Sequence, residues 1–249
     1  MPTLLYILIF LFGICIGSFL NVVILRVPAG ESIVTGPSHC MRCGRRLKWY
    51  EMVPVFSFLA LRGRCAGCGE KISPQYPLIE AANGLLWVFL FWHFGLTFTA
   101  LCACGFVSCL LALSVIDART GEIPVGINIC IAVLAVCMTA LDLSNWPAHV
   151  IGLFAVSGPL YVLWLITRGN GVGGGDIKLL AASGLLLGWK LILFAVVAGC
   201  VVAVCVHIPR MALKKAGRAL AFGPYLSVGM FLALLWGESV INWYLRLLH

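Results

Sequence analysis

The sequence predicts an all-α polytopic membrane protein with about eight transmembrane helices and one sizeable polar loop. Of its 249 residues, 62% are hydrophobic and only 10% are charged, whereas a soluble globular domain carries roughly 25% charged residues. Several apolar stretches approach the ~20 residues that a helix needs to cross the hydrocarbon core of a bilayer. The few charged residues gather in short segments, as expected of loops between membrane helices.

The apolar stretches define the expected spans, which lie near residues 3–25, 78–95, 97–116, 123–141, 148–167, 177–188, 190–208 and 222–245. The first stretch, 1–25, lacks the basic start of a signal peptide and is too long for its apolar part, so we expect a retained first span. Before the second span, Pro74 and Pro77 are expected to stop the approaching helix. The stretch 177–188 is only ~18 Å long as a helix, so we expect it to be re-entrant, tilted or buried among other helices.

The basic residues indicate how the chain is oriented in the membrane. The net charge is +8, and eight of the 17 Lys and Arg residues lie between Arg26 and Lys71, with four more between Arg210 and Arg218. A basic balance also suits nucleic-acid binding, but in a membrane protein clustered basic loops mark the cytoplasmic side. We therefore expect a cytoplasmic loop at 26–77, a lipid bilayer around the spans and no nucleic-acid partner.

Four of the twelve cysteines form a pattern typical of a metal site. The other eight lie in apolar runs, where cysteine behaves as a small hydrophobic residue. Cys40, Cys43, Cys65 and Cys68 form two C-x2-C pairs that are separated by 21 residues. Four thiolates satisfy tetrahedral Zn²⁺ and leave no position for water, so we expect a structural zinc site. Two disulfides or a redox motif are the alternatives, although cytoplasmic thiols stay reduced. His39 is expected to lie beside the ion or in solvent rather than to bind it.

Two aspartates at the edges of apolar segments are the candidate catalytic residues. The chain has only three aspartates and six glutamates, and carboxylates beside hydrocarbon are costly and usually functional. Asp117 ends one apolar run and Asp176 opens another, and the count of spans puts both on the cytoplasmic side. The structural alternatives are an N-cap role for Asp176 on a helix starting at Ile177 and a helix-end pairing of Asp117 with Arg119. The third aspartate, Asp142, is expected to be a solvated loop residue.

As a pair, the two carboxylates are suited to acid–base hydrolysis of an amide bond. Two carboxylates about 3 Å apart cannot both ionise easily, so they share one proton. The ionised member takes a proton from water, while the protonated member hydrogen-bonds the scissile carbonyl and later protonates the leaving amine. Because 58 residues separate Asp117 from Asp176, only the fold can bring the two together.

The glycine run before Asp176 has two interpretations. It invites comparison with phosphate-binding loops, but it lacks the G-x-x-x-x-G-K-[ST] pattern and no apolar strand precedes it. The sequence better suits a structural role, in which Gly173, Gly174 and Gly175 allow a close backbone approach or let Asp176 enter the membrane on a non-helical stretch.

Together these motifs resemble the type IV prepilin peptidases, a family of membrane aspartic proteases with a GxGD motif. The matching segments are GSFLNVVILRVP at 17–28, the two C-x2-C pairs, SPQYPLIE at 73–80, DARTGEIP at 117–124, GVGGGDIKLLAASG at 171–184 and FGPYL at 222–226. Their joint order and spacing extend the resemblance over nearly the whole chain. Two departures are Ala221, where the family often has Pro, and the segment VGIN after Pro124.

The resemblance implies a bifunctional enzyme of the bacterial inner membrane, with its active site on the cytoplasmic side. Asp117 and Asp176 would be the catalytic pair and Gly173, Gly174 and Gly175 the active-site loop. A first span at 1–25 and a four-cysteine zinc-binding loop at 26–77 would precede a membrane aspartic protease domain at 78–249. The enzyme would cut the basic leader from type IV prepilins or type II secretion pseudopilins just after a Gly. It would then methylate the new N-terminus with S-adenosylmethionine.

The sequence assigns no residues to the methyl-transfer step, although the edges of the cysteine loop, including Glu70 and Glu80, are candidates. It predicts no oligomeric state.

Two other classes of function are alternatives. A proton- or Na⁺-coupled transporter would explain the carboxylates and glycines but gives the cysteines no role. A membrane adaptor would explain the cysteines but not the aspartates.

Overall fold

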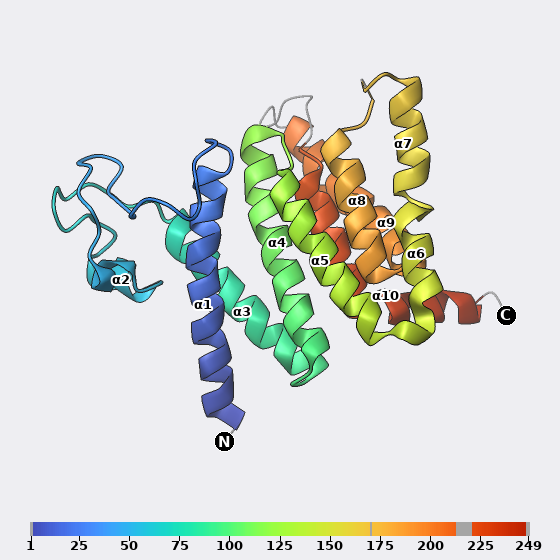
Figure 1. The fold of residues 1–249 in the computed structure, drawn as a ribbon, viewed down its shortest axis with the longest axis horizontal. Helices are drawn as coiled ribbons and strands as arrows, with labels where there is room; N and C mark the ends of the chain where they lie inside the picture. Colours follow the sequence, from blue (N-terminus) through green and yellow to red (C-terminus); the bar gives the residue numbers. More distant parts are fainter. Residues whose placement is uncertain (1, 170, 213–220, 248–249) are drawn as a thin grey trace. The chain divides into compact units, whose positions relative to one another are not determined.

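The computed structural model describes residues 2–169, 171–212 and 221–247. Across these residues the regular structure is helical (Figure 1), apart from isolated bridges in the polar loop, which confirms the predicted fold class. Six helices are long and apolar enough to cross a membrane.

The chain divides into two compact units, Met1–Ala100 and Leu101–His249. The predicted boundaries at 25 and 77 stay predictions. Of the predicted basic cluster at 210–218, residues 213–218 lie outside the described part of the chain.

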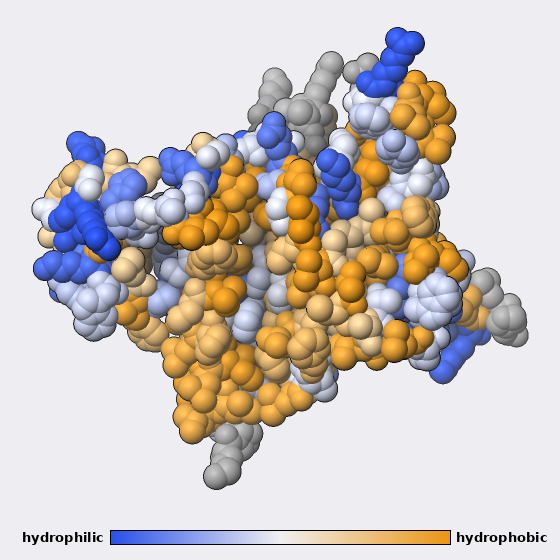
Figure 2. All heavy atoms as spheres, in the orientation of Figure 1, coloured by the Kyte–Doolittle hydropathy of each residue, from blue (hydrophilic) through white to orange (hydrophobic). Residues whose placement is uncertain are grey.

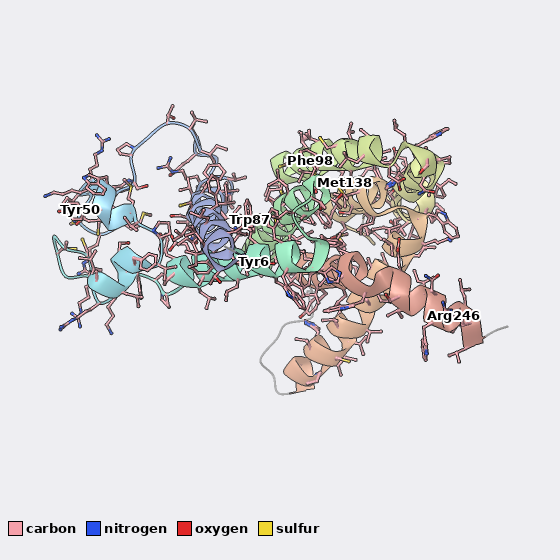
Figure 3. All side chains as sticks on the ribbon, turned by 90° about the horizontal axis from the view of Figure 1, so that it is seen from below. Tyr6, Tyr50, Trp87, Phe98, Met138 and Arg246 are labelled. Atoms are coloured by element: carbon pink, nitrogen blue, oxygen red, sulfur yellow. The ribbon has the colours of Figure 1, made fainter. Side chains whose placement is uncertain are left out.

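The first unit is built on an antiparallel pair of long helices. α1 (Pro2–Arg26) and α3 (Gln75–Phe94) pack along each other (Figure 1). Small residues allow this approach, since a Cβ on Gly13 would lie 2.8 Å from the Cα of Gly84. The buried side chain of Asn83 donates a hydrogen bond of 2.7 Å to the Gly13 carbonyl. Trp87, labelled in Figure 3, lies against Gly13. Small residues and interhelical hydrogen bonds are typical of helix pairs in membranes.

A polar segment connects α1 to α3. It contains the short helices η1 (Trp49–Met52) and α2 (Phe56–Ala60), and Figure 2 shows hydrophilic residues gathered over it, in contrast to the hydrophobic lower part of α1. α3 begins at Gln75, three residues before the expected start of this span near residue 78. Pro74 is the N-cap and Pro77 lies in the first turn, where a backbone N–H has no helical partner and proline is therefore tolerated.

The second unit holds the remaining helices, which are α4 (Phe98–Thr120), α5 (Val125–Leu141), η2 (Leu143–Asn145), α6 (Trp146–Ala155), α7 (Ser157–Ile166), α8 (Gly174–Leu187), α9 (Trp189–Ala212) and α10 (Gly223–Leu247). Each predicted span in this part of the chain falls on one or two of them. α5 is a shorter apolar helix of 17 residues. α8, with 14 residues, is too short for a ~30 Å hydrocarbon core. It packs against α5, α6 and α9 and is largely buried, which agrees with one of the three expected arrangements, burial among other helices.

The predicted single span at 148–167 is interrupted in the structure. α6 ends at Ala155 and α7 begins at Ser157, with Val156 between them at φ −110° and ψ −45°. Pro159 explains this interruption, because it lacks the N–H that would bond the Ala155 carbonyl and its ring would clash with that oxygen.

α8 is fixed among its neighbours by close packing and by two side-chain hydrogen bonds. Gly152 of α6 and Gly184 of α8 face each other so closely that a Cβ on either would collide with the backbone oxygen of the other. Near the end of α8, the Leu185 carbonyl lies 3.4 Å from the Thr139 hydroxyl of α5 and 2.9 Å from Nδ1 of His149. The position of α8 beside α5 and α6 is therefore closely determined.

Candidate functional site

Asp117 is buried at the meeting of two helices of the second unit. Its side chain lies in α4, one turn before the helix ends, and is only 5% exposed. The Gly223 N–H at the start of α10 donates a hydrogen bond of 2.8 Å to its Oδ2. The first N–H groups of a helix have no partner within the helix, and their partial positive charge favours an anion. The sequence prediction that Asp117 follows the span was wrong, because α4 continues to Thr120.

The close contact with Asp117 requires glycine at position 223. A Cβ there would lie 2.7 Å from Oδ2 and 3.0 Å from Cγ of Asp117. Any side chain would therefore push the carboxylate away from the α10 N-terminus. The sequence contained the FGPYL motif, but nothing in its pattern linked Gly223 to an aspartate 106 residues earlier in the chain.

Asp176 also lies at a helix N-terminus, but not as its cap. α8 begins at Gly174 with Gly173 as N-cap, so the alternative of Asp176 capping a helix that starts at Ile177 was wrong. The half-buried carboxylate folds back over the preceding turn, and a Cβ on Gly173 would lie 2.8 Å from its Oδ2. Both candidate acids thus lie at the first turn of a helix, Asp176 within α8 and Asp117 against the start of α10, where backbone N–H groups stabilise negative charge.

The three glycines before Asp176 differ in their surroundings. A Cβ on Gly175 would lie 2.9 Å from Cβ of Ile123, in the segment that follows α4. At Gly174 the nearest atom is Nε1 of Trp164, 4.0 Å away, so this position is open. A Cβ would therefore make a close contact at Gly173 and at Gly175 but not at Gly174, which matches the G-x-G-D register. The contact at Ile123 also brings the chain just after Asp117 beside the start of α8.

The two carboxylates influence each other electrostatically. Burial and the negative charge of Asp117 raise the pKa of Asp176 from its ordinary value of 3.8 to about 6. Asp176 lies in α8, which is not among the six candidate spans. A carboxyl group with this pKa is protonated in about a tenth of molecules at pH 7, far more often than an ordinary aspartate, so it can serve as the acid of an acid–base pair.

Asp142 has different surroundings from the candidate pair. Its carboxylate accepts hydrogen bonds from Ser144 and Asn145 in its own turn, and these lower its pKa. It also lies 3.8 Å from Nε2 of His149. Asp142 therefore belongs to a local turn between α5 and α6.

The four predicted thiols converge in the polar loop of the first unit. The sulfur atoms of Cys40, Cys43, Cys65 and Cys68 all lie within 4.8 Å of one another, and Sγ of Cys40 is 3.8 Å from Sγ of Cys68. Zn–S bonds of about 2.3 Å in a tetrahedron place sulfurs roughly 3.8 Å apart, whereas a disulfide needs about 2.05 Å. All four cysteines are free, and the cluster can hold a metal ion. His39 is outside it and lies 3.3 Å from the Pro37 carbonyl.

Two equivalent turns present these thiols. The Cys40 N–H bonds the Arg45 carbonyl, and the Cys65 N–H bonds the Glu70 carbonyl. Both turns end in a glycine with positive φ, +68° at Gly44 and +71° at Gly69, which glycine adopts without strain. The Cys68 and Gly67 N–H groups lower the pKa of the Cys65 thiol to about 6, and metal ions bind the thiolate form.

Carboxylates hold the loop together around the thiols. The buried Glu51 accepts hydrogen bonds of 2.7 Å from the Arg45 guanidinium and from the Lys48 N–H. The candidate Glu70 forms an exposed ion pair of 3.1 Å with Arg42. Glu80 is buried at the start of α3 and accepts a 2.7 Å hydrogen bond from the Val55 N–H. Glu80 therefore connects the loop to the helix pair below it.

Two family descriptions match the chain. The Bacterial Peptidase A24 N-terminal domain matches residues 11–94, and the Type IV leader peptidase family matches residues 104–208. The first match contains the thiol cluster, and the second contains both Asp117 and Asp176.

Several curated relatives match over most of their length and share one name, prepilin leader peptidase/N-methyltransferase. The protein of Stutzerimonas stutzeri is 32% identical, over 94% of this chain and 91% of the relative. The protein of Bacillus subtilis (strain 168) is 35% identical, over 96% of this chain and 98% of the relative. The protein of Burkholderia pseudomallei (strain 1026b) is 36% identical, over 90% of this chain and 83% of the relative. No solved structure matches the chain significantly.

Proposed function

Because the chain belongs to the type IV leader peptidase family, we propose that it removes the leader from type IV prepilins or type II secretion pseudopilins and then methylates the new N-terminus. The observation that carries the protease half is the placement of Asp117 and Asp176. Both carboxylates are partly or fully shielded from water at the first turns of α10 and α8, and the charge of Asp117 raises the pKa of Asp176. The names of the relatives support both halves. None of them supports a transporter.

The two carboxylates act as a general acid and a general base. Asp117, which accepts the Gly223 N–H, is the ionised member, because that bond stabilises its anion. Asp176 carries the shared proton, in keeping with its raised pKa. Asp117 takes a proton from the attacking water, while Asp176 hydrogen-bonds the scissile carbonyl and then supplies a proton to the leaving amine. The peptide bond breaks after the bond from water oxygen to carbonyl carbon has formed, so no covalent enzyme intermediate is needed.

The reaction takes place at the cytoplasmic face of the bacterial inner membrane. The basic loop after α1 favours that side for the first unit, and the candidate spans make the chain a multi-pass membrane protein. Prepilin and pseudopilin leaders are short and basic, so their cleavage site would remain at this face while the apolar helix that follows lies in the bilayer.

The thiol cluster holds a structural zinc ion. Cys40, Cys43, Cys65 and Cys68 supply four sulfur ligands that lie within 4.8 Å of one another, and four thiolates around tetrahedral Zn²⁺ leave no position for water. The ion orders a loop that has little core of its own. S-adenosylmethionine supplies the methyl group, and the edges of this loop, including Glu70 and Glu80, are the region proposed for that step.

Zinc removal tests the role of the cluster. Purified wild-type protein is expected to contain one zinc per chain, and Cys65→Ser is expected to release it and to speed proteolysis of the loop at 38–71, because metal binding drives its folding. Elemental analysis and limited proteolysis measure the two effects. Cys15→Ser, a lone exposed cysteine of α1, is the control and should keep both zinc and loop protection. A wild-type protein without zinc would contradict the assignment.

A two-step assay tests the proposed function. Purified enzyme in lipid is incubated with a prepilin-like substrate, first without and then with S-adenosylmethionine, and the mass of the product is measured by mass spectrometry. Loss of the leader is expected in both samples, and gain of one methyl group only in the second. Intact substrate after incubation with folded enzyme would reject the protease, and a cleaved but unmethylated product would reject the second activity alone.

A further inference from the structure

Asn128 is a buried amide whose polar groups have no partner. It is 5% exposed in the first turn of α5, and neither its side-chain nitrogen nor its side-chain oxygen makes a hydrogen bond. Leaving an amide unpaired in an apolar setting is unfavourable, and within a membrane protein water is scarce. An unpaired amide of this kind destabilises the substrate-free enzyme. We therefore expect its hydrogen-bond partner to be present only when substrate is bound.

The register of α5 against α8 places Asn128 beside the candidate active site. The two helices pack together along their length and run in the same direction (Figure 1). The register of the two helices is given by the hydrogen bond of 3.4 Å that the Thr139 hydroxyl donates to the Leu185 carbonyl. Asn128 precedes Thr139 by three helical turns, about 16 Å, and therefore lies on the same face of α5. Asp176 precedes Leu185 by about 14 Å along α8. Asn128 thus lies level with the first turn of α8.

A second contact agrees with this register. Ile123, just before α5, lies against Gly175 at the start of α8, where a Cβ on the glycine would be only 2.9 Å from the Cβ of Ile123. The starts of α5 and α8 are therefore neighbours, and the amide of Asn128 belongs to the same end of the unit as Asp176.

We propose that Asn128 binds the main chain of the substrate next to the scissile bond, through a peptide group that the substrate exposes when its helix unwinds. A peptide bond inside a helix is shielded, so the segment to be cut must lose its helical hydrogen bonds. Its freed N–H and C=O then need partners. A carboxamide offers one acceptor and two donors and can pair with both groups of one peptide. This inference rests on the proposed protease function.

Asn128→Leu tests the proposal, because leucine has a similar size but no polar group. The KM for a prepilin-like substrate is expected to rise about 10- to 100-fold, as for the loss of buried hydrogen bonds. The melting temperature is expected to stay the same or to rise, since an unpaired polar group has been removed. A residue needed only for folding would behave in the opposite way.

Ser183→Ala is the matched control. Its hydroxyl is also fully buried and unpaired, but it lies two turns further along α8, away from the first turn. It should leave cleavage unchanged and should not lower the melting temperature. A direct readout is substrate binding to the Asp176→Asn protein, which Asn128→Leu should weaken by the same factor as the KM.

Three outcomes would overturn the proposal. They are wild-type cleavage by Asn128→Leu, a loss of cleavage together with a lower melting temperature, and a loss of cleavage with unchanged substrate binding. Wild-type enzyme is measured in parallel, so a failure of the protease function itself appears as no cleavage in any sample. The two failures are therefore distinguishable.

Discussion

Replacement of Asp117 or Asp176 by asparagine is expected to lower prepilin cleavage by roughly 10²–10⁴-fold, because each variant removes one member of an acid–base pair. In Asp117→Asn the new amide oxygen can still accept the hydrogen bond from the Gly223 N–H, but it cannot take a proton from water. In Asp176→Asn the new side chain cannot supply the proton that the leaving amine requires. Single-turnover cleavage in lipid, followed by gel electrophoresis or mass spectrometry, measures the loss. The methylation of a peptide that has already been cut should be spared.

Asp176→Asn is also expected to change stability in a pH-dependent way. Burial and Asp117 raise the pKa of Asp176 from 3.8 to about 6, so between these values the folded state binds the proton more tightly than the unfolded state. The stability of the wild type then rises as pH falls through this window and is lost as pH rises through about 6. Asparagine does not ionise. The variant should therefore be more heat-stable than the wild type at pH 7–8, with a smaller difference at pH 5.

Asp142→Asn is the control for both measurements. Asp142 accepts hydrogen bonds within its own turn, and its replacement should leave cleavage within about twofold of the wild type, as for a surface site. If Asp117→Asn or Asp176→Asn cleaved at the wild-type rate, the protease assignment of the pair would be wrong. A loss of cleavage that followed only from a failure to fold would not support the pair either, and the melting temperature detects that case.

Replacement of Gly223 or Gly173 by alanine is also expected to cause a large loss of prepilin cleavage. A Cβ at Gly223 would lie 2.7 Å from Oδ2 of Asp117, and a Cβ at Gly173 would lie 2.8 Å from Oδ2 of Asp176. The carboxylate is the movable end of a side chain, so it should shift while the fold is kept. A misplacement of about 1 Å costs about 10²-fold in rate. Cleavage by Gly223→Ala and Gly173→Ala should therefore fall by about that factor.

The two neighbouring glycines should respond differently. Gly175→Ala must displace Ile123, whose Cβ is 2.9 Å from the new atom and whose backbone nitrogen is 3.6 Å away, so it should lower both activity and melting temperature. Gly174→Ala meets nothing closer than 4.0 Å and should keep cleavage within about twofold, because exposed positions without contacts tolerate substitution. Equal losses at Gly174 and Gly173 would mean that the run acts through backbone flexibility rather than through steric fit.

The arrangement of apolar stretches in the sequence was sufficient to predict an all-helical membrane protein and the position of nearly every helix. Two cases show the limit of that pattern. The break between α6 and α7 depends on Pro159, one residue within an otherwise continuous apolar run. The early start of α3 depends on Pro77 being tolerated in a first turn. Hydropathy averages over about a helical span, so it does not register the effect of a single residue on backbone hydrogen bonding.

The residues of the candidate site also separate into those that the sequence could predict and those that only the tertiary structure could identify. Residue type and spacing alone singled out Cys40, Cys43, Cys65 and Cys68, because two short C-x2-C turns each present two ligands whatever the remaining fold. Composition and position at the edges of apolar runs singled out Asp117 and Asp176, since carboxylates beside hydrocarbon are rare and costly. Only the tertiary structure decided that Gly223 supports Asp117 and that Asn128 lies level with Asp176. These relations join residues that are distant in sequence, and they depend on the register and close approach of packed helices, which no local pattern in the chain encodes.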